Sequence, residues 1–180
     1  MAYYYLVSQL PNISASEGKT ALPLNTEEFR ELASRFISNE EKAVLEGLSL
    51  VPPMELTSTG SAFLDVWYEK ERNLRFALAQ IRAQKLKKDS VPLPPGCTAD
   101  IISAARTAVG MDSPLSAEEY LNQYRMDTLK SLTPIDGFCV DAIYAYGLKL
   151  MLAQRMRLFD VEIGKDSYHK IYDEILGDAK

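Results

Sequence analysis

The amino-acid sequence predicts an all-α protein: a multi-helix orthogonal bundle with two long helices, over about 61–88 and 134–162, and a short extended N-terminal segment. Three observations lead to this prediction. Apolar residues recur three and four positions apart along most of the chain, which is the spacing of one helix face. Residues that cap helix N-termini precede most of these apolar sets. Residues 61–88 contain neither proline nor glycine, so nothing interrupts a helix there.

The first residues are the exception to the helical pattern. The segment Tyr3–Val7 is aromatic and β-prone, and no other segment stands out as its partner strand. We therefore expect an extended arm, an isolated edge, or a strand that pairs with another chain. The residues do not choose among these three.

The first half of the chain carries signals for three helices. Asn25 or Thr26 can cap the first, and Ser38 with Glu41 forms a capping box for the second. The run Val51-Pro52-Pro53 then ends helical structure, because proline lacks the amide hydrogen. The long third helix has an apolar seam made of Phe63, Trp67, Leu74, Leu78 and Ile81.

The second half begins after the proline-rich segment 91–96, which is the best candidate for a junction. We expect a single helical domain, 1–180, and leave open a division into two lobes, 1–90 and 97–180. Thr98 can cap one helix, and Ser116 with Glu119 forms a second capping box. Thr133-Pro134 suits the start of the second long helix, which Gly164 ends or bends. A last amphipathic set consists of Tyr168, Ile171, Tyr172, Ile175 and Leu176.

Composition describes an ordinary globular chain. Of its 180 residues 47% are hydrophobic and 25% charged, which excludes a disordered tail or a coiled rod. Cys97 and Cys139 are too far apart for a C-x-x-C motif, and Cys139 in its apolar stretch is expected to be a buried thiol. The first residues lack the basic region and long apolar run typical of a signal peptide, and charges interrupt the apolar window 138–156. We therefore expect a cytoplasmic protein.

No motif fixes a chemistry. Glu17–Thr20 imitates the end of a phosphate-binding loop, but Ile13 stands where the first glycine belongs and Pro23 blocks the helix, so a flexible loop is favoured. His169 is the single histidine and has no nucleophile motif to serve, so a solvated side chain is favoured. We expect no catalytic residue, no metal site and no cofactor, and hence not an enzyme.

The other acidic and basic candidates have structural interpretations. Three carboxylate pairs fall in the first turn of predicted helices, where negative charge complements the helix dipole. These pairs are Glu27-Glu28, Glu40-Glu41 and Glu118-Glu119. Asp141 and Lys149 interrupt the most apolar helix, eight residues apart and on nearly one face. They either face solvent together, which is favoured, or meet partners on neighbouring helices.

The strongest charge feature is the segment Lys70–Lys88. Seven basic side chains against one acidic side chain give it a formal charge of +6, while the whole chain carries −5. A positive helix on an acidic protein is typical of a docking surface for an acidic partner, a phosphate or nucleic acid. A solvated charged face is an equally good interpretation. The acidic total and the scarcity of aromatic residues among the basic ones, where Phe76 stands alone, argue against nucleic acid.

Two resemblances suggest a class of partner. The opening segment Tyr3–Pro11, together with Tyr146–Leu150, Arg155 and Phe159-Asp160, resembles a bacterial family of uncharacterised proteins encoded beside V-type ATPase genes. The likeness covers most of the chain and consists of packing patterns. It implies a non-catalytic subunit or assembly partner of a V-type rotary ATPase, cytoplasmic and held at the inner face of the membrane through that complex.

The second resemblance is to the V-type ATPase subunit called C in prokaryotes and d in eukaryotes. Glu71–Arg75 and Ile81–Lys85 resemble one helix of that subunit, and the tail Leu150–Gly164 resembles its closing helix. That family forms a helical funnel between the rotor ring and the central stalk, and this shorter chain would supply part of it. The resemblance implies contact with stalk or rotor subunits through Arg72, Arg75, Arg82 and Lys85. The alternative is that Arg72, Asn73 and Arg82 brace neighbouring helices.

Overall fold

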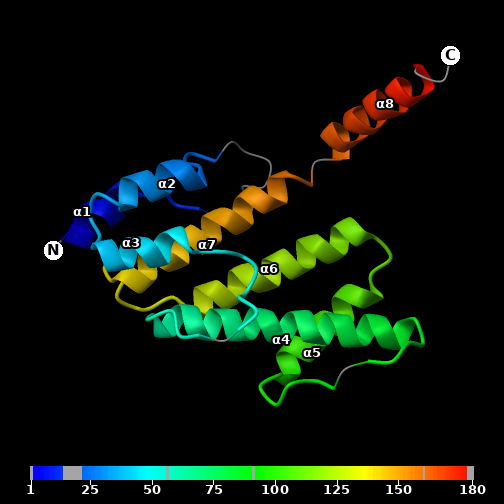
Figure 1. Ribbon diagram of the computed structural model, residues 1–180, viewed down its shortest axis with the longest axis horizontal. Coiled ribbons are helices and arrows are strands. Elements are labelled where there is room, and N and C mark those ends of the chain that lie inside the picture. Colours follow the sequence, from blue (N-terminus) through cyan, green and yellow to red (C-terminus); the bar gives the residue numbers. More distant parts are fainter. Residues whose placement is uncertain (1, 14–21, 56, 91, 160, 178–180) are drawn as a thin grey trace.

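The computed structural model describes residues 2–13, 22–55, 57–90, 92–159 and 161–177. All regular secondary structure in these ranges is α-helical, which confirms the all-α prediction (Figure 1). The helices are α1 (Ala2–Gln9), α2 (Thr26–Ala33), α3 (Asn39–Glu46), α4 (Ala62–Lys85), α5 (Ala99–Gly110), α6 (Pro114–Leu132), α7 (Val140–Arg157) and α8 (Val161–Gly177).

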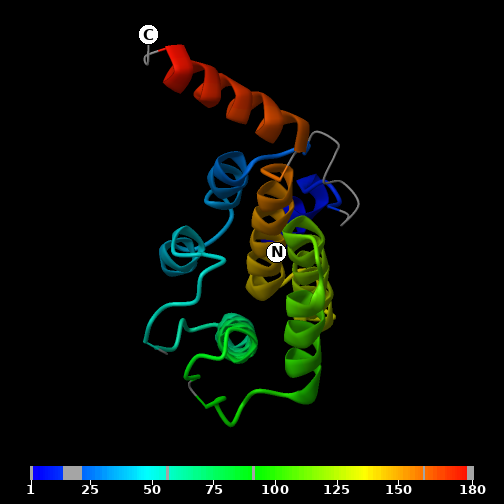
Figure 2. The same cartoon turned by 90° about the vertical axis from the view of Figure 1, so that its right-hand side faces the viewer.

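Helix α7 is the centre of the bundle. It contacts α2, α3, α4 and α6, while α4 also packs on α5 and α6. Its side chains are buried around most of its circumference, in line with the apolar composition of its sequence. In two views at right angles, α8 stands apart from all the other helices (Figures 1 and 2).

Two hydrophobic cores hold the bundle together. The first lies among α1, α2, α3, the start of α4, the end of α6, and α7. The second lies among the end of α4, α5 and the start of α6. Because α4 and α6 contribute to both cores, the segments 1–90 and 97–180 each reach into both of them. Residues 92–96 lie in the loop between α4 and α5.

Two predicted helix starts are confirmed in detail. Asn25 Oδ1 accepts the Glu28 N–H at 2.9 Å, and the Glu28 carboxylate accepts the Asn25 N–H at 2.9 Å. Ser38 and Glu41 form the same reciprocal pair, at 3.3 and 2.7 Å. The long helix α4 also forms as expected and ends three residues before the predicted boundary at 88.

The prediction of an extended N-terminal segment is wrong, because residues 2–9 form the helix α1. Packing overrides the β-propensity of the tyrosines. Leu6 is completely buried, and Tyr3 of the same helix and Leu10, just after its end, pack against the first core. The Tyr3 hydroxyl donates to Glu41 Oε1 at 2.5 Å, and the Tyr4 ring stacks on Phe138 with centroids 4.1 Å apart.

The boundaries of α6 and α7 also differ from the predicted ones. Helix α6 starts at Pro114 with Ser113 as its cap, so Glu118-Glu119 lies in its second turn and Ser116 caps nothing. Thr133 ends α6 instead of starting α7, and its hydroxyl donates to Leu129 O at 2.6 Å. A turn follows, in which the Asp136 side chain accepts the Phe138 N–H at 2.9 Å. Helix α7 therefore begins only at Val140.

The predicted helix to residue 162 is divided into α7 and α8. Leu158 and Phe159 donate their N–H groups three residues back, to Arg155 O at 3.1 Å and Met156 O at 3.2 Å, which tightens and ends α7. Gly164 does not end a helix, because it lies inside α8.

Candidate interaction surface

A row of polar side chains on α4 holds the loop segment 49–59 against that helix. The row has helical spacing and consists of Asp65, Tyr68, Arg72 and Arg75. Tyr68 Oη accepts the Ser49 N–H at 3.3 Å. The Asp65 carboxylate accepts three bonds, from the Ser58 hydroxyl at 2.7 Å and from the N–H and hydroxyl of Thr59, both at 2.8 Å. The backbone bond from Thr59 is the main cause that holds the pKa of Asp65 below its ordinary value.

The two arginines of this row are used inside the chain. Arg72 donates to the carbonyl oxygens of Pro53 and Met54, the latter at 2.9 Å. Arg75 donates to Leu50 O at 3.2 Å. Two of the four basic residues predicted to meet a partner therefore brace a loop, which is the alternative that the sequence left open for Arg72.

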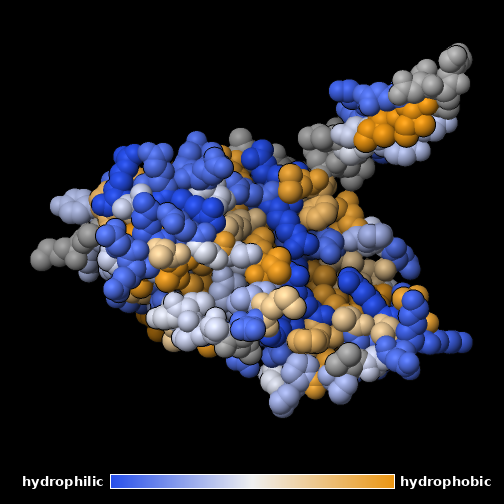
Figure 3. Space-filling model, viewed as in Figure 1, coloured by the Kyte–Doolittle hydropathy of each residue, from blue (hydrophilic) through white to orange (hydrophobic). Residues whose placement is uncertain are grey.

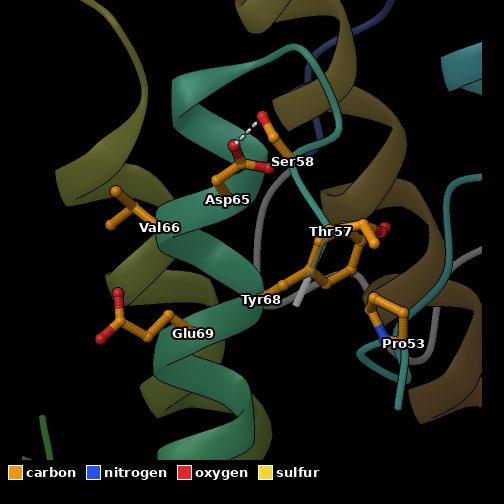
Figure 4. A pocket seen from close by; sticks show the side chains of 7 residues that line it. All are labelled: Pro53, Thr57, Ser58, Asp65, Val66, Tyr68 and Glu69. Atoms are coloured by element: carbon orange, nitrogen blue, oxygen red, sulfur yellow. Dashed lines mark hydrogen bonds between the residues drawn. The ribbon is translucent and has the colours of Figure 1, made fainter. Parts of the chain in front are cut away.

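A small cavity lies between this loop and α4. It measures about 310 Å³ and is lined by Pro53, Thr57, Ser58, Asp65, Val66, Tyr68 and Glu69 (Figure 4). Its volume is at the lower limit of small-molecule sites. The Asp65 carboxylate at its edge is already occupied by the loop, and the Glu69 side chain is exposed to solvent. The Asp65 carboxylate therefore has a structural role at this cavity.

Next to the row lies a buried ion-pair network. Arg125 of α6 donates from Nε to Glu71 Oε2 at 2.9 Å and from Nη2 to Glu71 Oε1 at 3.0 Å. Arg75 Nε adds a third contact to Glu71 Oε1 at 2.9 Å. Because the Glu71 and Arg125 side chains are only 1% and 7% exposed, this network belongs to the interior of the bundle.

Two further residues of the segment Lys70–Lys88 contact the region around α5. Asn73 Nδ2 donates to Gly96 O at 3.0 Å, in the loop before α5. Lys85 Nζ donates to Val109 O at 3.0 Å, near the end of α5, although Lys85 itself is exposed. Asn73 is therefore a bracing residue, and Lys85 combines such a contact with access to solvent.

Within the segment Lys70–Lys88, the exposed cations lie at the C-terminal end of α4 and just after it. They are Arg82, Lys85, Lys87 and Lys88. Of these four side chains, Lys85 is the one with a hydrogen-bond partner among the described residues. Leu86, which is 66% exposed, lies between these cations. We call Arg82, Lys85, Leu86, Lys87 and Lys88 the cationic end of α4. Exposed cations on an acidic protein can attract and orient an acidic surface.

The chain leaves α4 through a strained turn at this surface. Lys88 N–H donates to Ala83 O at 2.9 Å, and Lys87 N–H donates to Gln84 O at 3.1 Å. This is a Schellman motif, in which the residue after the cap adopts a left-handed conformation and is usually glycine. Here Lys87 takes that position with φ of +53°, so a charged side chain occupies a place where glycine would be more stable.

Asp141 and Lys149 do not form a solvent-facing stripe. Asp141 Oδ1 accepts the Ser61 hydroxyl at 2.6 Å, which ties the start of α7 to the start of α4. Lys149 is half-buried, and burial lowers the pKa of its ammonium group, with a smaller effect from Lys130 nearby. The alternative of partners on neighbouring helices is thus the better account of Asp141.

The remaining candidates offer no site. His169 is exposed on α8, and its ring contacts Tyr168 at 5.8 Å between centroids. Glu17–Thr20 lies outside the described residues. Cys97 and Cys139 are half-buried, so the buried thiol expected at Cys139, which is the N-cap of α7, was wrong. Within the described ranges, no three acidic, histidine or cysteine side chains gather as metal ligands would. No described helix has the length and apolar character needed to cross a membrane.

Sequence reasoning missed the loop-holding role of Asp65 and Tyr68 and the exposure of Leu86. A signal for the first was available, because Asp65, Tyr68, Arg72 and Arg75 repeat at helical spacing opposite a proline-rich loop. No protein-family model matches the chain, and neither a curated protein nor a solved structure shows significant similarity to it.

Proposed function

We propose that this protein is a non-catalytic subunit or assembly partner of a V-type rotary ATPase, in which it connects stalk and rotor subunits. The observation that carries the proposal is the cationic end of α4, which is exposed on a rigid helical body whose total charge is −5. Such a surface attracts an acidic protein surface and orients it during encounter. The family resemblance supplies the class of partner.

Within the proposed site, Arg82 and Lys85 are the residues to bind the partner, together with Lys87 and Lys88. Arg72 and Arg75 do not bind the partner directly in this proposal, because they hold the loop 49–59 on α4. Arg75 also contacts the buried Glu71. A change at Arg75 would therefore disturb folding and could not serve as a test of binding.

The test is purification of the tagged full-length protein from its native cell in mild detergent, followed by identification of the proteins that accompany it. We expect head, stalk or rotor-ring subunits of the ATPase. Charge reversal by Arg82→Glu with Lys85→Glu should remove them. The matched control is Arg35→Glu with Lys42→Glu, which changes the net charge equally at exposed pairs of small energetic value.

Recovery of the protein without any ATPase subunit would contradict the proposal. Recovery of the same amount of ATPase subunits with the charge-reversal variant and with its control would contradict it as well. Binding of nucleic acid that weakens steeply with salt would instead favour a stand-alone binding module. A gel-shift titration with single-stranded and duplex probes separates that function from the proposed one.

A further inference from the structure

Helix α8 carries an uncovered apolar stripe. Tyr168, Ile171, Tyr172 and Ile175 are 64%, 57%, 49% and 64% exposed. They follow one another at intervals of three, one and three residues, which places them on one side of the helix. Figure 3 shows this side as a hydrophobic band along a helix that projects from the body. We call these four residues the α8 stripe.

The helix is long enough to form but lacks contacts to stabilise it. Every described side chain from residue 164 to residue 175 is exposed. A helix of 17 residues without tertiary packing is marginal in water, since most helical stability in proteins comes from burying an apolar face. The fold itself therefore indicates that the α8 stripe is covered when the protein works.

We propose that the α8 stripe is covered by α8 of a second copy of this chain, in an antiparallel pair. The order of the side chains supports this partner. When two stripes run in opposite directions about a point between Ile171 and Tyr172, Tyr168 lies opposite Ile175 and Ile171 lies opposite Tyr172. Each flat ring then meets an aliphatic side chain, and none of the four residues faces its own copy.

The charges of α8 favour the same direction. The half from 161 to 170 holds Glu162, Lys165, Asp166, His169 and Lys170, a formal charge of 0 with neutral histidine. The half from 171 to 175 holds Asp173 and Glu174, a formal charge of −2. An antiparallel pair places unlike halves side by side and opposes the two helix dipoles, whereas a parallel pair places like halves together.

The same charges weigh against a lipid surface as the occupant. Helices that lie on anionic membranes are rich in lysine and arginine on their polar face. The sequence of α8 has four acidic residues and two basic ones. Its polar face would be repelled by acidic headgroups, while a second copy provides charges of both signs.

The pair should be weak. Two helices of 17 residues that meet along four side chains each bury less than a standard protein interface. We expect dissociation constants in the micromolar range, on the order of 1 to 100 µM. Because pairing stabilises helix, the helical content of the full-length protein should rise with its concentration.

Sedimentation equilibrium of the full-length protein over a concentration series tests the pair. We expect a monomer–dimer equilibrium that Ile171→Asp with Ile175→Asp weakens by more than about tenfold. The matched control is Asp166→Asn with Lys170→Gln. These two residues lie on the opposite side of α8, and their joint replacement leaves the net charge of that half unchanged. The control should dimerise like the original protein.

Disulfide formation tests the direction. In a background with Cys97→Ala and Cys139→Ala, protein with Tyr168→Cys is mixed with protein with Ile175→Cys and oxidised. Antiparallel pairing predicts mainly bonds between the two different variants. Mainly like-with-like bonds would mean a parallel pair and overturn the proposal.

Three results in solution would overturn it as well. The first is a monomer at every concentration. The second is a dimer that the two aspartates in the stripe leave unchanged. The third is a monomer that binds neutral phosphatidylcholine vesicles and loses that binding when Ile171 and Ile175 are replaced by aspartate. That result would mean that the α8 stripe binds a lipid surface. None of these results bears on the cationic end of α4, so the test is independent of the proposed ATPase role.

Discussion

Arg125 of α6 donates two hydrogen bonds, of 2.9 and 3.0 Å, to the Glu71 carboxylate of α4. This ion pair lies where the two hydrophobic cores meet. Glu71 follows Trp67 of the first core by one turn and precedes Leu74 of the second. Arg125 stands between Leu121 of the second core and Leu129 of the first. The pair therefore fixes how α4 and α6 align, because a shift of either helix would leave a charge buried alone.

We expect loss of either partner to be costly. Glu71→Leu leaves the Arg125 guanidinium buried without its carboxylate, and such an uncompensated charge costs about 3–5 kcal/mol of unfolding free energy. Urea denaturation of the single variants Glu71→Leu and Arg125→Met and of the double variant forms a cycle. The double variant should recover much of the loss, since apolar pairs of similar size replace buried ion pairs well. A double variant as unstable as the sum of the single ones would contradict this account.

A second prediction concerns the close approach of α2 to α7. A Cβ at Gly147 would lie 2.9 Å from Phe29 Cε1 and 3.1 Å from Leu48 Cδ1, both in buried side chains. We expect Gly147→Ala to lower the unfolding free energy by about 1–2 kcal/mol, because overpacking exceeds the gain in helix propensity.

Gly164 of α8 is the matched control. A Cβ there meets nothing within 4 Å, so Gly164→Ala should raise the helical content seen by circular dichroism without loss of stability. Equal effects of the two substitutions would show that the contact with Phe29 does not limit the packing.

The fold could be predicted where local signals and packing agree. The capping boxes at Asn25 and Ser38 need only residues three apart in sequence, and the structure reproduces them. The N-terminal segment shows the opposite case. Its helix depends on the burial of Leu6 and on a bond from Tyr3 to Glu41, 38 residues away, and no local pattern contains that information.

The candidate surface was predictable only in part. The sequence identified the positive segment Lys70–Lys88, but a charge count does not tell exposed cations from those that hold a loop. Arg72 bonds to carbonyl oxygens 18 and 19 residues away, and Arg125 reaches Glu71 across 54 residues. Such pairings follow from the arrangement of the helices, which sequence spacing alone does not provide.

A third prediction concerns alkaline pH. The hydrogen bond from Tyr3 to Glu41, helped by burial, raises the pKa of Tyr3 to about 12. The phenol is neutral in the folded protein and ionises more readily after unfolding, near the ordinary tyrosine pKa of 10.0. Its contribution to stability is therefore complete below pH 10 and is lost as the pH rises toward 12.

Urea denaturation at a series of pH values on both sides of 10 checks this. Tyr3→Phe should make the decline less steep, while a decline remains because burial also raises the pKa of Tyr144 to about 12. An identical pH dependence in the variant would mean that the bond to Glu41 does not control the titration of Tyr3.

The last prediction concerns Lys87, whose left-handed backbone closes the Schellman motif after α4. An L-residue other than glycine costs roughly 1–2 kcal/mol in this conformation, so Lys87→Gly should raise the unfolding free energy by about 1 kcal/mol, after allowance for the greater freedom of glycine in the unfolded chain. Lys88→Gly is the control, since φ at Lys88 is not positive, and it should give no gain.

Both substitutions remove one charge from the cationic end of α4, so both should weaken capture of an acidic partner to a similar degree. A variant with Lys87→Gly that is more stable yet binds less well would show that the lysine is kept there for binding at the expense of stability. Gains from both glycines, or from neither, would contradict the assignment of strain to Lys87.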